Sequence, residues 1–269
     1  MVVPWSHNQH SKTVRILLTN DDGIHAPGFE VLEKIAARLS DDVWAVAPAE
    51  EQSGTGHSLT LTRPIRLRRH GERKFSVSGT PTDAVMMALA HIMKDEPPDL
   101  ILSGINRGAN LAEDVTYSGT VSAAMEGALA GVRSIALSQI YAREGMGDTV
   151  PFASAEAWAE RVINVLAEAP FTPGTLVNVN FPALAPDVVK GIRVCRQGIR
   201  DYGRLRIVER TDPRGYRYYW FGLAPTVETP GHVTDLEVVA DGYIAVTPLF
   251  LDMTHEPGLD LLARQFGEA

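Results

Sequence analysis

Residues 16–28 read ILLTNDDGIHAPG, and the organisation of the chain follows from them. The apolar opening, Ile16 to Leu18, predicts a buried strand. Two adjacent carboxylates, Asp21 and Asp22, come next and are followed at once by a glycine. The segment after Pro27 predicts a helix with one apolar face, made of Phe29, Leu32, Ile35, Ala36 and Leu39. The acidic pair therefore lies between a strand end and a helix start, where open α/β sheets bind ligands.

The acidic pair has more than one explanation. Two ionised carboxylates about 4 Å apart repel each other by roughly 4 kcal/mol at an effective dielectric constant of about 20. The side chains must therefore separate into water, keep one proton, or hold a cation between them. The first outcome corresponds to a solvated Asp-Gly turn in which one carboxylate caps the helix. The last corresponds to a metal site, and the pair alone leaves both open.

Composition limits the classes of protein to consider. The chain has 269 residues, of which 45% are hydrophobic and 22% are charged, as in an ordinary globular protein. A net charge of −8 argues against a nucleic-acid-binding surface. Cys195 is the only cysteine, so no internal disulfide forms, and a reduced compartment fits. We find no signal peptide and no membrane-spanning run, and we expect neither nucleic acid nor membrane as a partner.

Strand and helix patterns alternate from residue 14 to about residue 181. This alternation predicts an α/β fold with a doubly wound, mostly parallel, Rossmann-like sheet. It includes an edge strand at 59–67 and, after Ser118, a helix whose many small residues let it lie close to the sheet. We expect a disordered tail at 1–13, an α/β core at 14–185 and a C-terminal region at 186–269.

The C-terminal region has a different texture. Residues 192–246 are rich in aromatic residues and turn signals, and we find no convincing amphipathic helix among them. They predict β-hairpins that project from the sheet as an arm, and such an arm often packs against a partner. A final strand and a short helix near 259–265 close the chain.

Oxygen-bearing side chains follow several predicted strands. In a parallel sheet these loops share one edge, so we expect their side chains to converge there. The candidates are Asp21, Asp22, Ser53, Asn106 and Asn110. Carboxylate, hydroxyl and amide oxygens suit a hard cation such as Mg²⁺ or Mn²⁺ better than zinc.

A predicted helix start offers an anion site beside these loops. Ser118, Gly119 and Thr120 supply free backbone N–H groups, two hydroxyls and the positive end of a helix dipole. The triplet fits a plain helix cap equally well. A cation next to an anion cradle favours hydrolysis of a phosphate ester by metal-activated water. A binding module without turnover, or an enzyme with an acid pair and no metal, remains an alternative.

Further motifs occur in a fixed order along the chain. They are ILLTNDDG at 16–23 with APG at 26–28, Ala47-Pro48, Ser53-Gly54, GTPTD at 79–83, SGIN at 103–106 with Gly108 and Asn110, YSGTV at 117–121 with AAMEG at 123–127, NVNFP at 178–182, and TPL at 247–249 with Asp252. Together they resemble the SurE survival-protein family, the metal-dependent 5′-nucleotidases. The resemblance covers roughly Val14 to Thr254.

The resemblance implies a role for each candidate. Asp21, Asp22, Ser53 and Asn106 would hold one divalent metal ion, Mg²⁺ or Mn²⁺. The phosphate would be bound by Asn110, Ser118, Gly119 and Thr120, and catalysis would fall to Asp21, Asp22 and Asn110.

The resemblance also implies the substrates and the assembly. The substrates would be nucleoside 5′- and 3′-monophosphates, hydrolysed with broad specificity to nucleoside and phosphate, with exopolyphosphatase activity alongside. The protein would be cytoplasmic and would form a homodimer, or a homotetramer, by exchange of C-terminal arms.

Overall fold

The structure, a computed structural model, describes residues 13–141, 152–200, 205–223 and 233–267. The expected tail at 1–13 falls outside these residues, except for its last position. The bounds of the elements, in chain order, are β1 Arg15–Thr19, α1 Pro27–Leu39, β2 Asp42–Pro48, β3 Leu67–Arg69, β4 Lys74–Val77, α2 Pro81–Met87 with a π-helical turn Ala88–Ile92, β5 Leu100–Arg107, a 3₁₀ turn η2 Ala112–Thr116, α3 Gly119–Leu129, β6 Arg133–Gln139, α4 Ala153–Glu168, β7 Thr175–Phe181, β8 Ile192–Val194, β9 Leu205–Thr211, β10 Arg217–Leu223, α5 Asp235–Ala240, β11 Ile244–Phe250 and α6 Glu256–Phe266.

One mixed sheet forms the centre of the molecule. Its nine strands lie in the order β3-β4-β2-β1-β5-β6-β7-β11-β8, and neighbours run parallel from β4 to β7. The chain places β2 and β4 on one side of β1, and β5, β6 and β7 on the other. The strand order therefore reverses between β1 and β5, which is the kind of crevice where α/β sheets bind ligands. The α/β fold with a mostly parallel sheet is confirmed.

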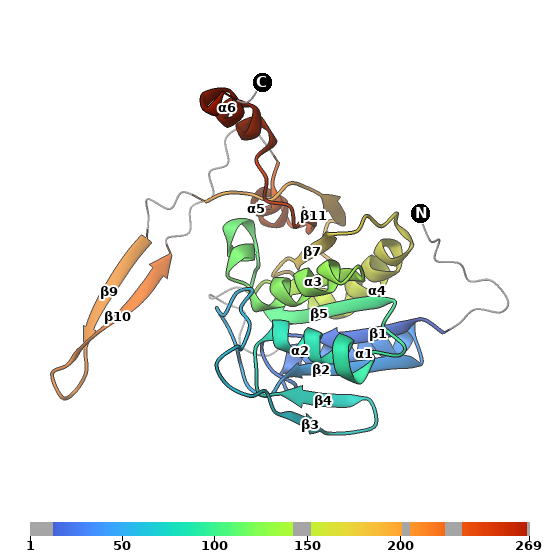
Figure 1. Ribbon diagram of the computed structural model, residues 1–269. Helices are drawn as coiled ribbons and strands as arrows, with labels where there is room; N and C mark the ends of the chain where they lie inside the picture. Colours follow the sequence, from blue (N-terminus) through green and yellow to red (C-terminus); the bar gives the residue numbers. More distant parts are fainter. Residues whose placement is uncertain (1–12, 142–151, 201–204, 224–232, 268–269) are drawn as a thin grey trace.

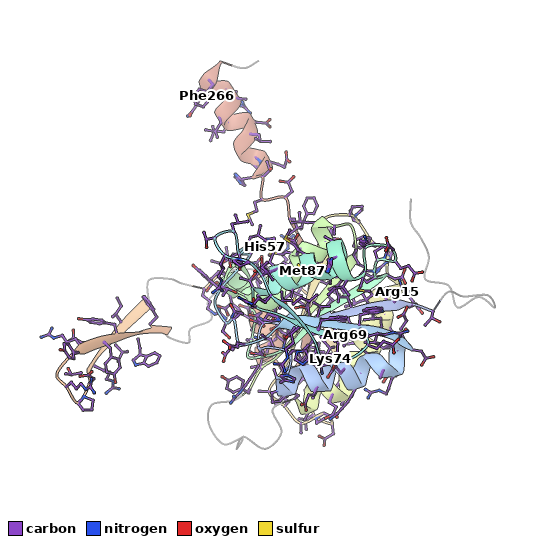
Figure 2. All side chains as sticks on the ribbon, turned by 60° about the horizontal axis from the view of Figure 1, so that its bottom comes forward. Arg15, His57, Arg69, Lys74, Met87 and Phe266 are labelled. Atoms are coloured by element: carbon purple, nitrogen blue, oxygen red, sulfur yellow. The ribbon has the colours of Figure 1, made fainter. Side chains whose placement is uncertain are left out.

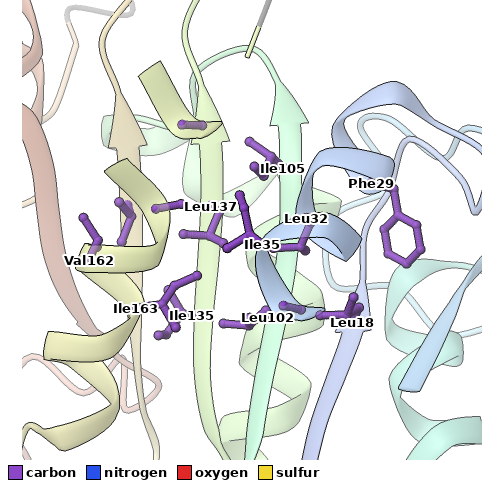
Figure 3. Packing of buried hydrophobic residues seen from close by; sticks show 14 of the residues in the cluster. Leu18, Phe29, Leu32, Ile35, Leu102, Ile105, Ile135, Leu137, Val162 and Ile163 are labelled. Carbon is purple, nitrogen blue, oxygen red and sulfur yellow. The ribbon is translucent and has the colours of Figure 1, made fainter. Parts of the chain in front are cut away.

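Helices cover both faces of this sheet (Figure 1). Leu17 and Leu18 point to opposite faces, because successive side chains of a strand alternate. Leu18 belongs to the cluster under α1 and α4, whereas Leu17 belongs to the cluster under α2 and α3. Figure 3 shows the first cluster, in which Ile35 of α1 and Ile163 of α4 face the strands. The apolar runs in the central strands follow from burial on both faces.

Helix α3 lies unusually close to the sheet. A Cβ atom added at Gly127 would lie 2.3 Å from Ser134 Oγ and 2.5 Å from Ile101 Cδ1. A larger residue would force the helix away from β5 and β6. The small residues of this helix therefore let it approach the sheet, as the sequence predicts, and its N-terminus reaches the carboxyl ends of the strands.

Two expectations about local structure are wrong. Residues 59–66 are not part of the edge strand, since β3 is confined to Leu67–Arg69. The start of α2 binds this segment instead: Thr60 N–H donates to Asp83 Oδ1 (3.0 Å), and Ser58 O accepts from Thr80 Oγ1 (2.7 Å).

Helix α5 is also present where we expected hairpins alone. It spans six residues, which is too short for a clear apolar period, although Thr234 and Glu237 form a capping box.

The C-terminal region extends beyond the core. Strands β9 and β10 pair with each other in a separate antiparallel hairpin, which points away from the central sheet (Figure 1). Helix α6 also projects, with Phe266 near its far end (Figure 2), and none of its residues is buried. The expected C-terminal hairpin arm is confirmed. Within the described residues, no helix has the length and apolar character needed to cross a bilayer.

Candidate active site

The acidic pair lies in a tight turn at the end of β1. Asn20 closes this turn with its side chain, because Nδ2 donates to Gly23 O (2.8 Å) and Oδ1 accepts from Gly23 N–H (3.2 Å). Gly23 has a φ of +101°, which a residue with a Cβ rarely adopts. Asp21 is 4% exposed, whereas Asp22 is half-buried. The turn therefore presents two carboxylates at fixed positions above the sheet.

The start of α3 packs directly against Asp21. Thr120, which is fully buried, donates a hydrogen bond from its hydroxyl to Asp21 Oδ1. A Cβ atom added at Gly119 would lie 2.7 Å from Asp21 Cβ and 3.0 Å from Pro81 Cγ. Glycine at this position thus allows the helix N-terminus to reach the carboxylate. Residues predicted for the metal and for the phosphate are in direct contact here.

The second aspartate joins the acidic pair to the end of β5. Arg107 N–H donates to Asp22 Oδ2 (3.2 Å), which places the neighbouring residue, Asn106, next to the acidic turn. The start of α1 approaches the same strand, because a Cβ atom at Gly28 would lie 2.0 Å from Ile105 O. The Asn106 side chain donates to Gly108 O (3.2 Å) and is half-buried. The carboxyl ends of β1 and β5 therefore meet as expected.

The loop after β2 reaches the acidic pair through its backbone. Gln52 N–H donates to Asp21 O (2.8 Å), so Ser53 lies one residue away from this contact. The Ser53 side chain is exposed and donates to Glu51 Oε1 (2.8 Å). The structure thus brings the loop, but not the Ser53 hydroxyl, into contact with the turn. Glu51 is a third carboxylate near the site, and its place two residues before Ser53 is the signal that would have suggested it.

Asn110 is held by a network of buried amides. Its side chain, in a residue that is 6% exposed, donates to Ser138 Oγ (2.8 Å). Its backbone N–H donates to Asn180 Oδ1 (2.9 Å), and its carbonyl accepts from Asn178 Nδ2 (2.7 Å) and Asn180 Nδ2 (3.0 Å). The two asparagines of β7 belong to the NVNFP motif, but sequence reasoning gave them no role.

Ser118 is the N-cap of α3. Its hydroxyl accepts from Val121 N–H (3.1 Å), so the capping role is present. Among the described residues, the Gly119 N–H has no hydrogen-bond acceptor. The Thr120 N–H faces the Asp21 carboxylate and lowers its pKa. The first turn of α3 therefore directs the Thr120 donors at Asp21, while the Gly119 N–H has no acceptor within the described part of the chain.

Burial makes both carboxylates hard to ionise. Desolvation raises the pKa of Asp21 to about 6, against hydrogen bonds from Thr120 that lower it, and the charge of Asp22 adds to the increase. Desolvation also raises the pKa of Asp22, and Glu51 contributes, while the amide and charge of Arg107 oppose the shift. The charge of Arg107 acts on Asp22, whereas the hydrogen bonds that lower the pKa of Asp21 come from neutral groups.

These features fit a hard divalent cation. Two carboxylates lie close together in a partly desolvated turn, and neutral oxygen donors lie on the adjoining loops. In the part of the chain that the structure describes, no three His, Cys, Asp or Glu side chains cluster as a metal site. A site with two carboxylates and neutral hydroxyl and amide oxygens does not require such a cluster. None of the candidate ligands is a histidine or a cysteine, the residues that zinc prefers.

The site has a specific combination of features: an Asp-Asp turn at the strand-order reversal, an asparagine loop after β5, and a serine-capped helix against the first aspartate. The family model described as "Survival protein SurE" matches residues 16–204. This chain belongs to the SurE family. The family expected from the sequence motifs is therefore confirmed.

Individual members of the SurE family are similar to this chain over nearly its whole length. A protein named 5′-nucleotidase SurE from Rhizorhabdus wittichii is 66% identical over 91% of this chain and 97% of its own. Another of that name, from Erythrobacter litoralis, is 58% identical over 94% of this chain and 100% of its own. The solved structure of the SurE protein from Aquifex aeolicus matches with a TM-score of 0.80 and 37% identity, covering 93% of this chain and 99% of the other.

Proposed function

We propose that this SurE family member is a phosphoric monoester hydrolase, a 5′-nucleotidase that converts nucleoside monophosphates to nucleoside and phosphate with one divalent cation, Mg²⁺ or Mn²⁺. The observation that carries this proposal is the packing of Gly119 and Thr120, at the start of α3, against Asp21. A group that binds anions thereby adjoins a carboxylate that favours a cation. The names of the similar proteins point to the same activity.

In this proposal the four oxygen-bearing residues hold the cation. They are Asp21, Asp22, Ser53 and Asn106. When bound there, a divalent cation stabilises the charge that develops on the phosphoryl oxygens and makes water more acidic. Thr120 keeps the Asp21 carboxylate in one orientation through its hydroxyl, and Asn20 does the same for the backbone of the turn.

The phosphate is bound by residues around the start of α3. Gly119 offers its free N–H, and the helix dipole adds positive potential at this end. Ser118 retains a hydroxyl proton to donate, and Asn110 retains the second proton of its side-chain amide. These groups fix the phosphoryl group beside the acidic pair, so that orientation contributes to the rate.

The test is phosphate release from the purified chain. The substrates are 5′-AMP, 3′-AMP, an aryl phosphate and inorganic polyphosphate, each with Mg²⁺, with Mn²⁺ or with excess EDTA. We expect release from all four with metal and none with EDTA, which would establish the broad specificity and exopolyphosphatase activity as well. Nucleotide binding without release would favour a binding module. Full activity in EDTA would favour an acid pair that works without metal.

We also propose that the arms join two copies of the chain. The hairpin exposes large apolar side chains, including Trp220 at 64% and Phe221 at 81% exposure, and α6 exposes Phe266 at 81%. Surfaces of this kind are common at interfaces between proteins. Light scattering after size exclusion should show a homodimer, or a homotetramer, and deletion of 205–223 should give a monomer. A monomeric full-length chain at micromolar concentration would contradict this assembly.

We propose a cytoplasmic location, which the resemblance to the family implies. The single cysteine, Cys195, fits a reducing compartment, because secreted proteins of moderate size often use disulfides. Fractionation of cells with an antibody to the chain should recover it with the cytoplasmic fraction.

A further inference from the structure

The loop between Asn110 and Ser118 contains a residue in an unusual conformation. Ala112 has a φ of +53°, in the left-handed region that side chains other than glycine rarely adopt. The residue is completely buried. Such a conformation persists where its surroundings hold it, and it is found often at functional sites. The surroundings of Ala112 therefore hold its backbone in this conformation.

Both backbone groups of Ala112 bind side chains from the C-terminal part of the chain. Its N–H donates to Asp235 Oδ2 (2.8 Å), and its carbonyl accepts from Gln197 Nε2 (2.8 Å). Leu236 packs against Ala112 and Leu111 in a small apolar cluster. The conformation of the loop is thus imposed by residues 85 and 123 positions further along the chain.

Asp235 is a buried carboxylate that has no place in the proposed chemistry. It has no exposed surface, and its other oxygen accepts from Gly198 N–H (2.8 Å). A Cβ atom at Gly198 would lie 2.9 Å from Asp235 Oδ1, so the close approach depends on glycine. Desolvation raises the pKa of Asp235, while these amides oppose the shift. Burying this carboxylate is costly, and the Leu236 amide and the charge of Arg200 stabilise it together with the Ala112 and Gly198 amides.

Arg200 adds a second attachment to the same loop. Its guanidinium donates to Leu111 O (3.2 Å) and pairs with Glu113 Oε1 (3.2 Å) and Asp114 Oδ1 (2.8 Å). Its backbone N–H donates to Glu113 Oε2 (2.9 Å). One arginine therefore ties together the residues on both sides of Ala112.

The braced segment connects the two phosphate-binding candidates. Asn110 comes immediately before Leu111, and the Ser118 N–H donates to Asp114 O (3.0 Å) at the other end. A shift of the segment from Leu111 to Asp114 would therefore move Asn110 and the N-cap of α3 relative to each other. Small errors in such positions reduce catalysis strongly.

We propose that Asp235 is a positioning residue for phosphate binding: with Gln197 and Arg200 it fixes the 110–118 loop so that Asn110 and Ser118 act on the same phosphate. Phosphate binding by those two residues is itself part of the proposed function, on which this role depends. Arg200 and Asp235 flank the hairpin arm in sequence. Residues that lie before and after the arm in sequence therefore hold the 110–118 loop.

The first test variant is Asp235→Asn in the full-length chain. Asparagine keeps the shape but has one acceptor oxygen, so either the Ala112 or the Gly198 N–H loses its partner. We expect the inhibition constant for inorganic phosphate and the KM for 5′-AMP to rise about tenfold or more, as is typical when a supporting residue is removed. The Mn²⁺ concentration that gives half of the thermal shift should stay at the wild-type value. Gln197→Ala should show the same pattern more weakly.

Asp42→Asn is the control, because Asp42 lies at the amino end of β2, away from the carboxyl ends of the strands where the candidate site lies. Like Asp235, it is a carboxylate held by protein partners, here Arg15 Nε (2.7 Å) and Trp44 Nε1 (2.9 Å), although it is only half-buried. This variant should lower Tm without changing the phosphate constants.

Three results would overturn the role of Asp235. They are a wild-type phosphate constant in the Asp235 variant, an equal loss of Mn²⁺ and phosphate binding, and, if that variant does not fold, wild-type constants in Gln197→Ala. A wild-type chain that neither binds nor releases phosphate would instead overturn the proposed function.

Discussion

The Thr120 hydroxyl, in the first turn of α3, donates a hydrogen bond to Asp21 Oδ1 at the end of β1, although 99 positions separate the two residues in sequence. This contact joins a buried carboxylate, which favours a cation, to a helix N-terminus, which favours an anion. The same relationship explains why Gly119 lacks a side chain, since a Cβ atom there would collide with Asp21.

Thr120→Val should reduce activity by loosening Asp21. A hydrogen bond to a charged group contributes about 1.5–3 kcal/mol, so kcat/KM with Mn²⁺ should fall roughly 10- to 100-fold. Valine nearly conserves the volume of this buried side chain, so folding should be retained. Steady-state kinetics with 5′-AMP measure the effect. Thr175→Val, at the far end of β7, removes an exposed hydroxyl contact to Thr172 O and should leave activity unchanged. Unchanged activity in Thr120→Val as well would refute the role of the contact between Thr120 and Asp21.

Asp21→Asn should stabilise the metal-free protein at high pH. The pKa of Asp21 is about 6 in the folded chain against an ordinary value of 3.8, so the folded state retains a proton that the unfolded state releases. The stabilisation from this proton is complete below about pH 4 and is lost as the pH rises through 6, a difference of about 3 kcal/mol. The variant should therefore unfold at a higher urea concentration than wild type at about pH 8, with EDTA present.

The pH dependence gives its own control. At about pH 2.5, below both pKa values, the carboxylate is protonated in both states, so the variant and the wild type should differ little. Mn²⁺ should reverse the order at high pH, because it stabilises the wild type by binding Asp21 and should not bind the variant. An Asp21→Asn variant less stable than wild type in EDTA at high pH would contradict the pKa.

Gly119→Ala should separate the two halves of the site. The added Cβ would lie 2.7 Å from Asp21 Cβ and 3.0 Å from Pro81 Cγ, so the helix start must move. Overpacking of this kind costs about 1–3 kcal/mol of stability. A shift of about 1 Å in the phosphate site lowers kcat/KM by roughly 100-fold. Gly71→Ala is the control, since a Cβ there would meet its nearest atom at 3.8 Å; equal kinetics in both variants would contradict the prediction.

Asn180→Ala should weaken phosphate binding through Asn110. The substitution leaves the buried Asn110 N–H without its acceptor, which costs about 1–3 kcal/mol. The loop is expected to relax toward another partner, so the KM for 5′-AMP should rise by about tenfold, with a smaller change in Mn²⁺ affinity. Ser134→Ala, at the other end of the neighbouring strand, removes a local contact to Val132 O and serves as the control. A wild-type KM in Asn180→Ala would show that Asn110 needs no such support.

Much of the site was predictable, because parallel strands bring their carboxyl ends to one edge. That rule predicts that Asp21 and Asp22 lie next to the loop of Asn106. The hydrogen bond from the Arg107 N–H to Asp22 shows that they do. It does not anticipate that the Ser53 hydroxyl binds Glu51 or that Thr120 binds Asp21. Those contacts depend on where loops and helix starts settle, to within an ångström or two, and residue types at a given spacing do not fix such positions.

The sequence by itself determined the alternation of strands and helices, the acidic turn, the serine cap and the family, because apolar periodicity and short motifs are local properties. The tertiary structure alone decided which strands are neighbours, that Gly119 touches Asp21, and that Asp235 holds Ala112 from 123 positions away. The physical reason is that burial and long-range hydrogen bonds arise only when the whole chain has packed. Burial also raises the pKa of Asp21, and no local sequence pattern predicts that change.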